Sequence, residues 1–211
     1  MTRLSSVCIL ILTGVLIASV GCRSTTSPEQ SPDAGVFLPS GAGSTWVYTM
    51  AAGNTTYRTM LGDTVLEGRI YHILQDSVTF LPPNNSTSFV SQSYFRSDEN
   101  SLYEVLSLPV REGIFLDTRI GASWTEISDT TANPNARRWE YTTIALLPSF
   151  TAGGHTYSDV LQLELWEYYP GIPNAQPTMY EFYYAKNIGM VELMDSTHRG
   201  VAQVLSEYHI Q

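Results

Sequence analysis

Apolar and polar residues alternate with a period of two through much of the chain after Gly41, which is the pattern of β-strands with one buried face. In one such segment Leu161, Leu163 and Leu165 share a face, and polar residues occupy the positions between them. No window of twelve or more residues keeps the 3.6-residue period of an amphipathic helix. The pattern therefore predicts an all-β domain with little helix.

Turn residues separate these segments at intervals of about ten residues, as all-β domains require. Gly53–Asn54 and Asp98–Asn100 each predict a hairpin turn. Aromatic residues on both faces of several segments indicate strands covered on both sides, or a sheet curled around a pocket. We expect a predominantly antiparallel structure of roughly ten strands, either a curved sheet or half-barrel or two packed sheets. The expected strands are residues 46–50, 55–60, 69–80, 89–96, 101–107, 137–147, 160–169, 179–185, 190–195 and 201–209.

Two short sequences recur in the two halves of the chain. Gly43–Trp46 (GSTW) is echoed by Gly121–Trp124 (GASW), and Gly68–Tyr71 (GRIY) is echoed by Gly154–Tyr157 (GHTY). The two echoes start 25 residues apart in the first half and 33 residues apart in the second, so an insertion is needed, for which residues 129–136 are the candidate. If the echo reflects a duplication, it predicts two similar β units in one continuous structure.

The first residues have the layout of an export signal. Arg3 gives a positive start, and the apolar run of residues 7–18 that follows is too short for a stable membrane span. Ser19–Cys22 comes next, and the whole segment resembles the signal of bacterial lipoproteins, although Ser19 stands where a larger aliphatic residue is commoner. The resemblance implies that Cys22 receives a diacylglycerol anchor with palmitate-type chains and becomes the first residue of the mature protein.

The chain is therefore expected to consist of a lipoprotein signal peptide (residues 1–21), a flexible tether rich in Ser, Thr and Pro (residues 22–40) and a β domain (residues 41–211). Lipoproteins of bacteria with two membranes that carry Asp after the lipidated cysteine tend to stay at the inner membrane. Arg23 therefore implies the outer membrane of the cell envelope, with the domain facing either the periplasm or the cell surface.

Charge and cysteine content narrow the possible chemistry. The net charge is −9, and an acidic surface repels nucleic-acid backbones and anionic lipid headgroups. The two cysteines are Cys8, inside the signal, and Cys22, at the lipidation position. If the signal is cleaved, the mature domain has no free thiol, which excludes disulfides, thiolate catalysis and Cys-ligated metal sites.

A second resemblance covers both ends of the domain. Gly43, Trp46 and Tyr48 form a Gly-x-x-Trp-x-Tyr motif, and Tyr183–Val191 forms a Tyr-Tyr-Ala-Lys-x-Ile-Gly-x-Val motif. The pair is similar to a pattern in uncharacterised bacterial lipoproteins and secreted β domains. Asn187–Gly189 would be a hairpin turn, where glycine permits a positive φ. That group of proteins implies a fold but no activity and no catalytic residue.

No strong catalytic motif is present in the sequence. His155 and Asp159 belong to the residue types that bind metals, but two ligands do not make a site, and we expect them at the surface. The carboxylate pairs Glu164 with Glu167 and Glu181 with Glu192 are expected on solvated strand faces. The sequence therefore predicts no enzyme activity, no metal and no cofactor.

The aromatic residues of the last third of the domain are the best candidates for a ligand or recognition surface. They could form a stacking platform, line a hydrophobic pocket or belong to the core, and the core is the default interpretation. The candidates are Trp166, Tyr168, Tyr180, Phe182 and Tyr184.

We therefore expect a non-catalytic envelope lipoprotein with an interaction or scaffold role, held to the membrane by its lipid, with envelope proteins as partners and no nucleic-acid partner. The alternative is a carrier or sensor of a hydrophobic ligand held in the curved sheet, and a hydrolase is third. A large continuous apolar cavity would favour the carrier. A filled interior with an exposed aromatic patch would favour the interaction role, and a cleft with two carboxylates would favour the hydrolase.

Overall fold

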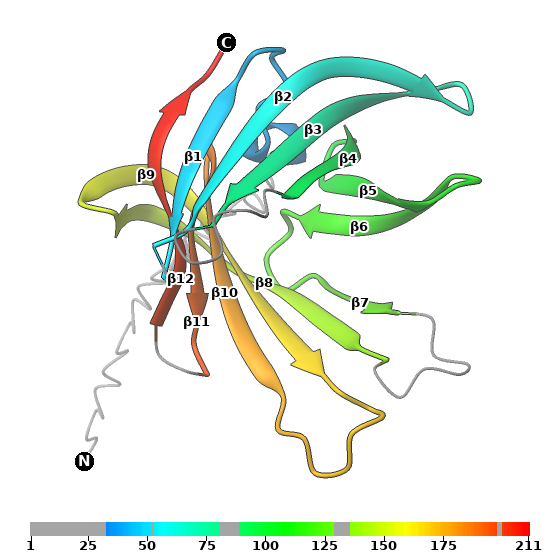
Figure 1. The fold of residues 1–211 in the computed structure, drawn as a ribbon, viewed down its shortest axis with the longest axis vertical. Helices are drawn as coiled ribbons and strands as arrows, with labels where there is room; N and C mark the ends of the chain where they lie inside the picture. Colours follow the sequence, from blue (N-terminus) through cyan, green and yellow to red (C-terminus); the bar gives the residue numbers. More distant parts are fainter. Residues whose placement is uncertain (1–32, 52, 81–88, 129–135, 198–199) are drawn as a thin grey trace, which may run out of the picture. The chain divides into compact units, whose positions relative to one another are not determined.

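The computed structural model describes residues 33–51, 53–80, 89–128, 136–197 and 200–211 (Figure 1). These residues form an all-β structure of twelve antiparallel strands and one short 3₁₀ turn, η1. No helix within them is long and apolar enough to cross a membrane. The elements are η1 (Ala34–Phe37), β1 (Thr45–Met50), β2 (Thr55–Leu66), β3 (Arg69–Thr79), β4 (Phe89–Ser97), β5 (Ser101–Ser107), β6 (Arg111–Asp117), β7 (Ser123–Ile127), β8 (Arg138–Ala152), β9 (His155–Tyr168), β10 (Thr178–Ala185), β11 (Gly189–Asp195) and β12 (Gly200–His209).

The strands belong to one sheet in the order β6-β5-β4-β3-β2-β1-β12-β11-β10-β9-β8-β7. The sheet curls until its two edge strands, β6 and β7, face one another, so it is a nearly closed barrel (Figure 1). The prediction of a curved, predominantly antiparallel all-β structure is confirmed.

The two halves of the sheet have the same topology. Strands β1–β6 form one antiparallel meander, β7–β12 form another, and β1 pairs with β12 where they join. The recurring sequences occupy matching places in the two meanders. The Gly-x-x-Trp echoes lead into β1 and β7, and the Gly-x-x-Tyr echoes lead into β3 and β9. The four glycines that begin these echoes share a positive φ: Gly43 (90°), Gly68 (79°), Gly121 (82°) and Gly154 (82°).

All ten expected strands are present, with shifted ends. Strand β2 continues to Leu66. Strand β8 continues to Ala152, and β9 already begins at His155, so the two form a long hairpin. The sequence analysis missed β6 and β7, which are the two edge strands. The candidate insertion at residues 129–136 lies almost wholly outside the described residues.

The expected tether is wrong at its C-terminal end. Ala34 and Phe37 in η1 are fully buried, and Leu38 is nearly so. The carboxylate of Asp33 accepts a hydrogen bond from the backbone N–H of Gly35 at 2.8 Å and caps the turn. The folded domain therefore begins before residue 41, because this segment buries apolar side chains in the core.

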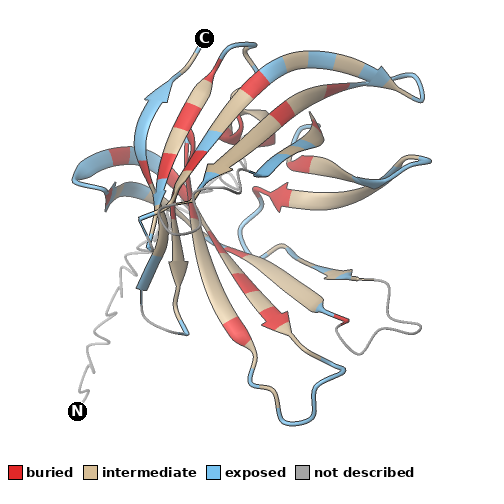
Figure 2. Ribbon diagram, in the orientation of Figure 1, coloured by how far each residue is buried: buried red, intermediate tan, exposed pale blue. Residues whose placement is uncertain are grey.

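The core lies where the strands cross near the centre of the domain, whereas the ends of the hairpins are mostly exposed (Figure 2). Trp46 and Tyr48 from β1 are fully buried, as expected for strands with one inward face. The neighbouring residues Tyr183 and Tyr184 point to opposite faces of β10, yet both are buried. The ring of Tyr183 stacks on the ring of Phe150 in the long β8–β9 hairpin, with the ring centres 3.9 Å apart. Part of the sheet is therefore covered on both faces.

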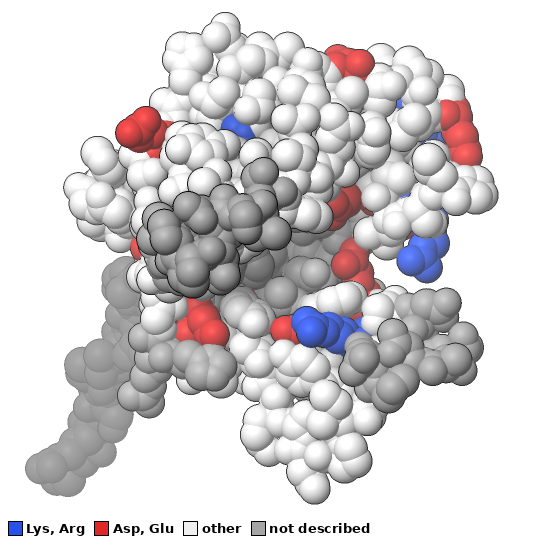
Figure 3. Space-filling view, in the orientation of Figure 1, with Lys and Arg blue, Asp and Glu red and all other residues white. Residues whose placement is uncertain are grey.

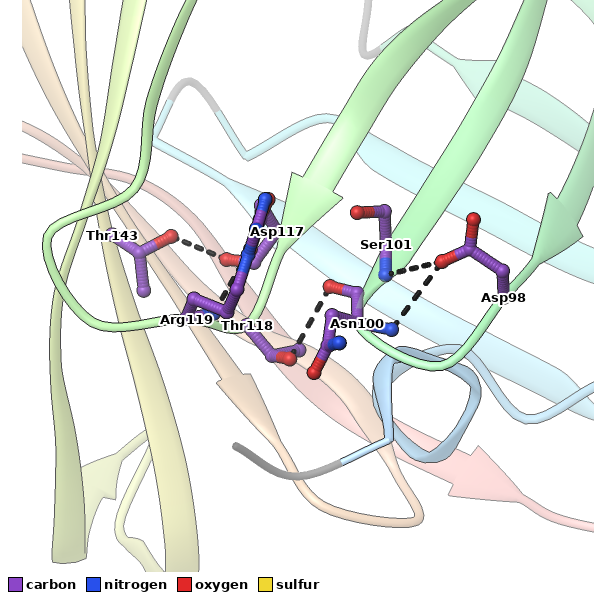
Figure 4. Close-up of polar contacts among 7 residues, drawn as sticks. All are labelled: Asp98, Asn100, Ser101, Asp117, Thr118, Arg119 and Thr143. Atoms are coloured by element: carbon purple, nitrogen blue, oxygen red, sulfur yellow. Dashed lines mark hydrogen bonds and ion pairs between the residues drawn. The ribbon is translucent and has the colours of Figure 1, made fainter. Parts of the chain in front are cut away.

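Polar contacts fix the segment that links β6 to β7 (Figure 4). The hydroxyl of Thr143 in β8 donates to the backbone carbonyl of Asp117, and the backbone N–H of Thr118 donates to the carbonyl of Asn100 at 2.9 Å. The buried carboxylate of Asp117 accepts hydrogen bonds from the side chain of Arg119. These contacts tie the link to both halves of the sheet, so they hold the two edge strands facing each other.

Candidate functional site

The two free edges of the sheet enclose an open cleft, which we call the seam cleft. β6 and β7 each pair with one neighbour, whereas every other described strand pairs on both sides. The cleft has a volume of about 410 Å³. In Figure 3 this face of the molecule is hollowed, with acidic side chains in the hollow and basic ones on its rim. The lining residues are Leu106, Arg111, Glu112, Gly113, Ile114, Trp124, Thr125, Glu126, Ile127, Ser128 and Trp139.

A second, more enclosed cavity of about 190 Å³ lies inside the curled sheet. It is polar on one side, because Arg58 and Asp76 face it from β2 and β3. The guanidinium donates to both oxygens of Asp76 at 2.8 Å and lies 5.6 Å from the ring centre of Tyr48. This ion pair neutralises Arg58, the only arginine among the described residues that line the cavity. The lining residues are Leu38, Trp46, Tyr48, Arg58, Leu74, Asp76, Ser93, Phe95, Glu104, Phe115, Tyr184, Gly189 and Met190.

Two carboxylates lie where the seam cleft and the inner cavity approach each other. Glu104 in β5 stands directly opposite Gly113 in β6, and residues opposite each other in an antiparallel pair share a face. Glu126 in β7 reaches across the gap to the same glycine, where its carboxylate fills the space that a Cβ would take. We call Glu104 and Glu126 the acidic pair.

Burial raises the pKa of both members of the acidic pair. The pKa of Glu126 is raised further by the nearby Glu104 carboxylate, against the effect of a hydrogen bond with Tyr141. The pKa of Glu104 is raised by burial and lowered in part by a hydrogen bond with Ser93 and by the charge of Arg58. The pair therefore combines partial desolvation with mutual repulsion, which a nearby cation would relieve.

The walls of the seam cleft carry aromatic and apolar side chains. Trp124 stacks on Tyr141 with the ring centres 5.1 Å apart. Its buried indole N–H has no hydrogen-bond acceptor among the described residues. Leu106 and Ile127 line the cleft and are 41% and 54% exposed. The cleft thus offers apolar contacts beside an acidic pair.

The five aromatic residues singled out from the sequence do not form one surface. The β9–β10 register places Tyr180, Phe182 and Tyr184 opposite Leu165, Leu163 and Leu161, on the face that lines the inner cavity. Tyr184 is buried there. Trp166 stands opposite Met179, on the other face, and Tyr168 shares that face because it lies two residues further along the strand.

The two outward aromatic residues have partners of their own. The indole N–H of Trp166 donates to Glu164 at 2.6 Å, and the guanidinium of Arg138 lies 4.4 Å from the ring centre of Tyr168. Both side chains are half-buried.

The other candidate pairs do not assemble a catalytic or metal site in the described part of the chain. His155 and Asp159 are exposed, and no group of three or more His, Cys, Asp or Glu residues there is placed to hold a metal ion. Glu164 and Glu167 point to opposite faces of β9, since they are three residues apart on one strand. Glu167 is buried, and it accepts hydrogen bonds from Arg137, Trp139 and Tyr169 at 2.6, 3.2 and 2.9 Å.

The remaining carboxylate pair lies on the outer face. Glu181 accepts hydrogen bonds from Gln162 at 2.9 Å and Ser196 at 2.5 Å. Glu192 stands opposite the outward residue Tyr183, and burial raises the pKa of its carboxyl group. Glu192 is buried rather than solvated, so the expectation of a solvated strand face is wrong for this residue.

The sequence analysis did not single out Glu104 or Glu126. One signal did point to β7, because the Gly121–Trp124 echo repeats the sequence that opens β1. The echo predicts that a strand opens at Trp124, and Glu126, two residues further along, lies on the same face of that strand.

Comparisons with known proteins support the fold. No protein-family model matches the chain, and no curated protein matches it significantly. Two solved structures are similar. A presumed lipoprotein from Parabacteroides distasonis has a TM-score of 0.55 and 14% identity, over 85% of this chain and 100% of that one. A presumed exported protein with a YmcC-like fold from Bacteroides fragilis has a TM-score of 0.50 and 12% identity, over 82% of this chain and 99% of that one. At such low identity the likeness establishes the fold alone.

Proposed function

We propose that this protein is an exported lipoprotein, anchored through Cys22 to the outer membrane, whose domain is a non-catalytic interaction module with the seam cleft as its binding site. The observation that carries the proposal is the cleft of about 410 Å³ between the two unpaired strand edges. Ligand sites in proteins are typically clefts of about 300–1,000 Å³ with a few convergent polar groups.

The lipid anchor is supported by the sequence up to Cys22, which lies outside the described residues, and by the kind of protein that shares the fold. Of the two similar structures, one is a presumed lipoprotein and the other a presumed exported protein. Arg23 after the cysteine favours the outer membrane. Because two or more acyl chains bind a bilayer firmly, an anchored domain needs no helical span.

The cavities favour the interaction role over the carrier of a hydrophobic ligand. The inner cavity of about 190 Å³ is smaller than a typical ligand pocket, and Arg58, Asp76 and Glu104 line it. A hydrophobic ligand there would desolvate charged groups without pairing with them.

A hydrolase is the second candidate, because the acidic pair places two carboxylates beside one cleft. A raised carboxyl pKa suits a general acid. Chromogenic glycosides and esters test this role: a hydrolase would turn one of them over and lose that activity in Glu126→Gln. The interaction role predicts no turnover by either protein.

Two experiments test the proposal. Cys22→Ala should leave an unprocessed precursor that incorporates no labelled palmitate, and normal processing of the variant would refute the anchor. A photo-crosslinking residue at Ile127 should trap an envelope protein, whereas the same residue at Val201, an exposed position on β12, should not. Equal trapping at both positions, or none at Ile127, would refute the seam cleft as the binding site.

A further inference from the structure

We propose that the seam cleft binds an extended segment of a partner protein, which pairs its backbone with the free edges of β6 and β7 and presents a basic side chain to the acidic pair. This inference rests on the proposed function, because it names the class of partner for the same cleft.

The first argument is the state of the two edges. A strand at a sheet edge exposes unpaired N–H and C=O groups, and proteins that bind peptides by strand addition use such edges. Here both edges line one cleft, from Arg111 to Ile114 on β6 and from Trp124 to Ser128 at β7. Because β6 and β7 run in opposite directions, such a strand would lie antiparallel to one edge and parallel to the other, and it could hydrogen-bond to both. A small ligand would leave the edges unpaired.

The second argument compares the two halves of the sheet. Trp46 and Trp124 occupy matching places, in the first strand of each meander. β1 has strands on both sides, and the indole N–H of Trp46 donates to the carbonyl of Ile188. β7 has a strand on one side only, and the indole N–H of Trp124 lacks an acceptor in the described part of the chain. At this matching place the second half therefore lacks, within the described residues, a hydrogen bond that the first half makes.

The third argument is charge. The acidic pair stands at the inner side of the cleft, and Arg58, which faces the adjoining cavity, is bound to Asp76 through two hydrogen bonds. Arg111 in the cleft wall lies near Glu126, but its side chain is exposed. A Lys or Arg of the partner would reduce the repulsion between the two carboxylates. An acidic residue there would increase it, and the net charge of −9 also favours basic segments.

The experiment is selection from a peptide library. The full-length chain, in detergent and immobilised, is panned against phage-displayed random decapeptides, in parallel with Glu104→Gln/Glu126→Gln. We expect the selected peptides to carry Lys or Arg among apolar residues and to be recovered at least tenfold better on the unaltered chain. Glu207→Gln, which removes an exposed carboxylate on β12, is the control and should yield the same peptides, in the same amounts, as the unaltered chain.

A second measurement does not depend on the variants. A selected peptide, synthesised with N-methyl groups on alternate amides, should lose at least tenfold in affinity by fluorescence anisotropy, because it can no longer donate to a strand edge. Equal affinity after methylation, selection of acidic peptides, or no enrichment would overturn the inference. Displacement of the peptide by spermidine at an equal concentration would instead assign the cleft to small cations and overturn it as well. If Ile127 traps an envelope protein but panning fails, this inference is wrong and the proposed function stands.

Discussion

The carboxylate of Glu126 on β7 lies where the side chain of any other residue in place of Gly113 on β6 would begin. A Cβ at position 113 would also lie 2.8 Å from the Leu106 side chain, closer than real Cβ contacts. Gly113 has no positive φ, so its backbone does not require glycine. Glycine is needed here because it leaves room: without a side chain at position 113, Glu126 can reach the inner face next to Glu104.

Gly113→Ala should therefore disturb the cleft while the fold persists. The methyl group meets two flexible side chains, so we expect a loss of about 1–2 kcal/mol in unfolding free energy, as for modest overpacking. Urea denaturation measures this loss. Gly200→Ala is the matched control, because a Cβ there meets no atom of a described residue within 4 Å. Equal stability of the two variants would show that the Gly113 contact is not tight.

The acidic pair should make the protein less stable at neutral pH than it is in mild acid. A carboxyl whose pKa is raised by folding stabilises the native state below its unfolded value of 4.5, and this stabilisation is lost as the pH rises through the folded value. Glu126→Gln should therefore raise the melting temperature at pH 7 and have little effect at pH 4. A lower melting temperature at pH 7 would contradict the assigned repulsion.

Glu112 should behave in the opposite way. Hydrogen bonds from Arg96, at 2.5 and 2.7 Å, lower the pKa of its carboxyl group to about 2. Its stabilising effect is present above the unfolded value of 4.5 and is lost as the pH falls toward 2. Glu112→Gln should cost about 2 kcal/mol at pH 7. The difference from the unaltered protein should shrink as the pH falls to 3, and a constant difference would argue against ionisation as its cause.

Trp46 should be the most costly core residue to remove. It is 1% exposed, and its indole N–H donates to the carbonyl of Ile188 in the β10–β11 turn. Trp46→Ala should lose about 3–5 kcal/mol of unfolding free energy. Trp46→Phe keeps a buried ring but loses the hydrogen bond, so it should lose less. Tyr208→Ala, which removes the half-exposed residue opposite Trp46, is the control and should lose under about 1 kcal/mol.

The strands that carry the core could be predicted because their apolar residues alternate or are β-branched and aromatic. The edge strands gave no such signal, for a physical reason. β7 is only five residues long and places Glu126 on its inward face, and β6 has Gly113 at the matching position. Because Glu126 and Gly113 stand at inward positions, the two edge strands lack the alternation of apolar and polar residues by which a strand is predicted. The predicted recognition surface lay on β9 and β10, but the register of these two strands places its aromatic residues on two different faces of the sheet.

Hydrogen exchange with and without a library-selected peptide shows whether the two edges of the sheet bind an extended segment. The unpaired amides of residues 111–117 and 123–127 should exchange quickly in the free protein and become protected when the peptide binds, while the paired amides of β2 stay unchanged. Protection on the outer face of β9 and β10, or unchanged exchange at both edges in the peptide-bound protein, would show that the seam cleft is not the binding site.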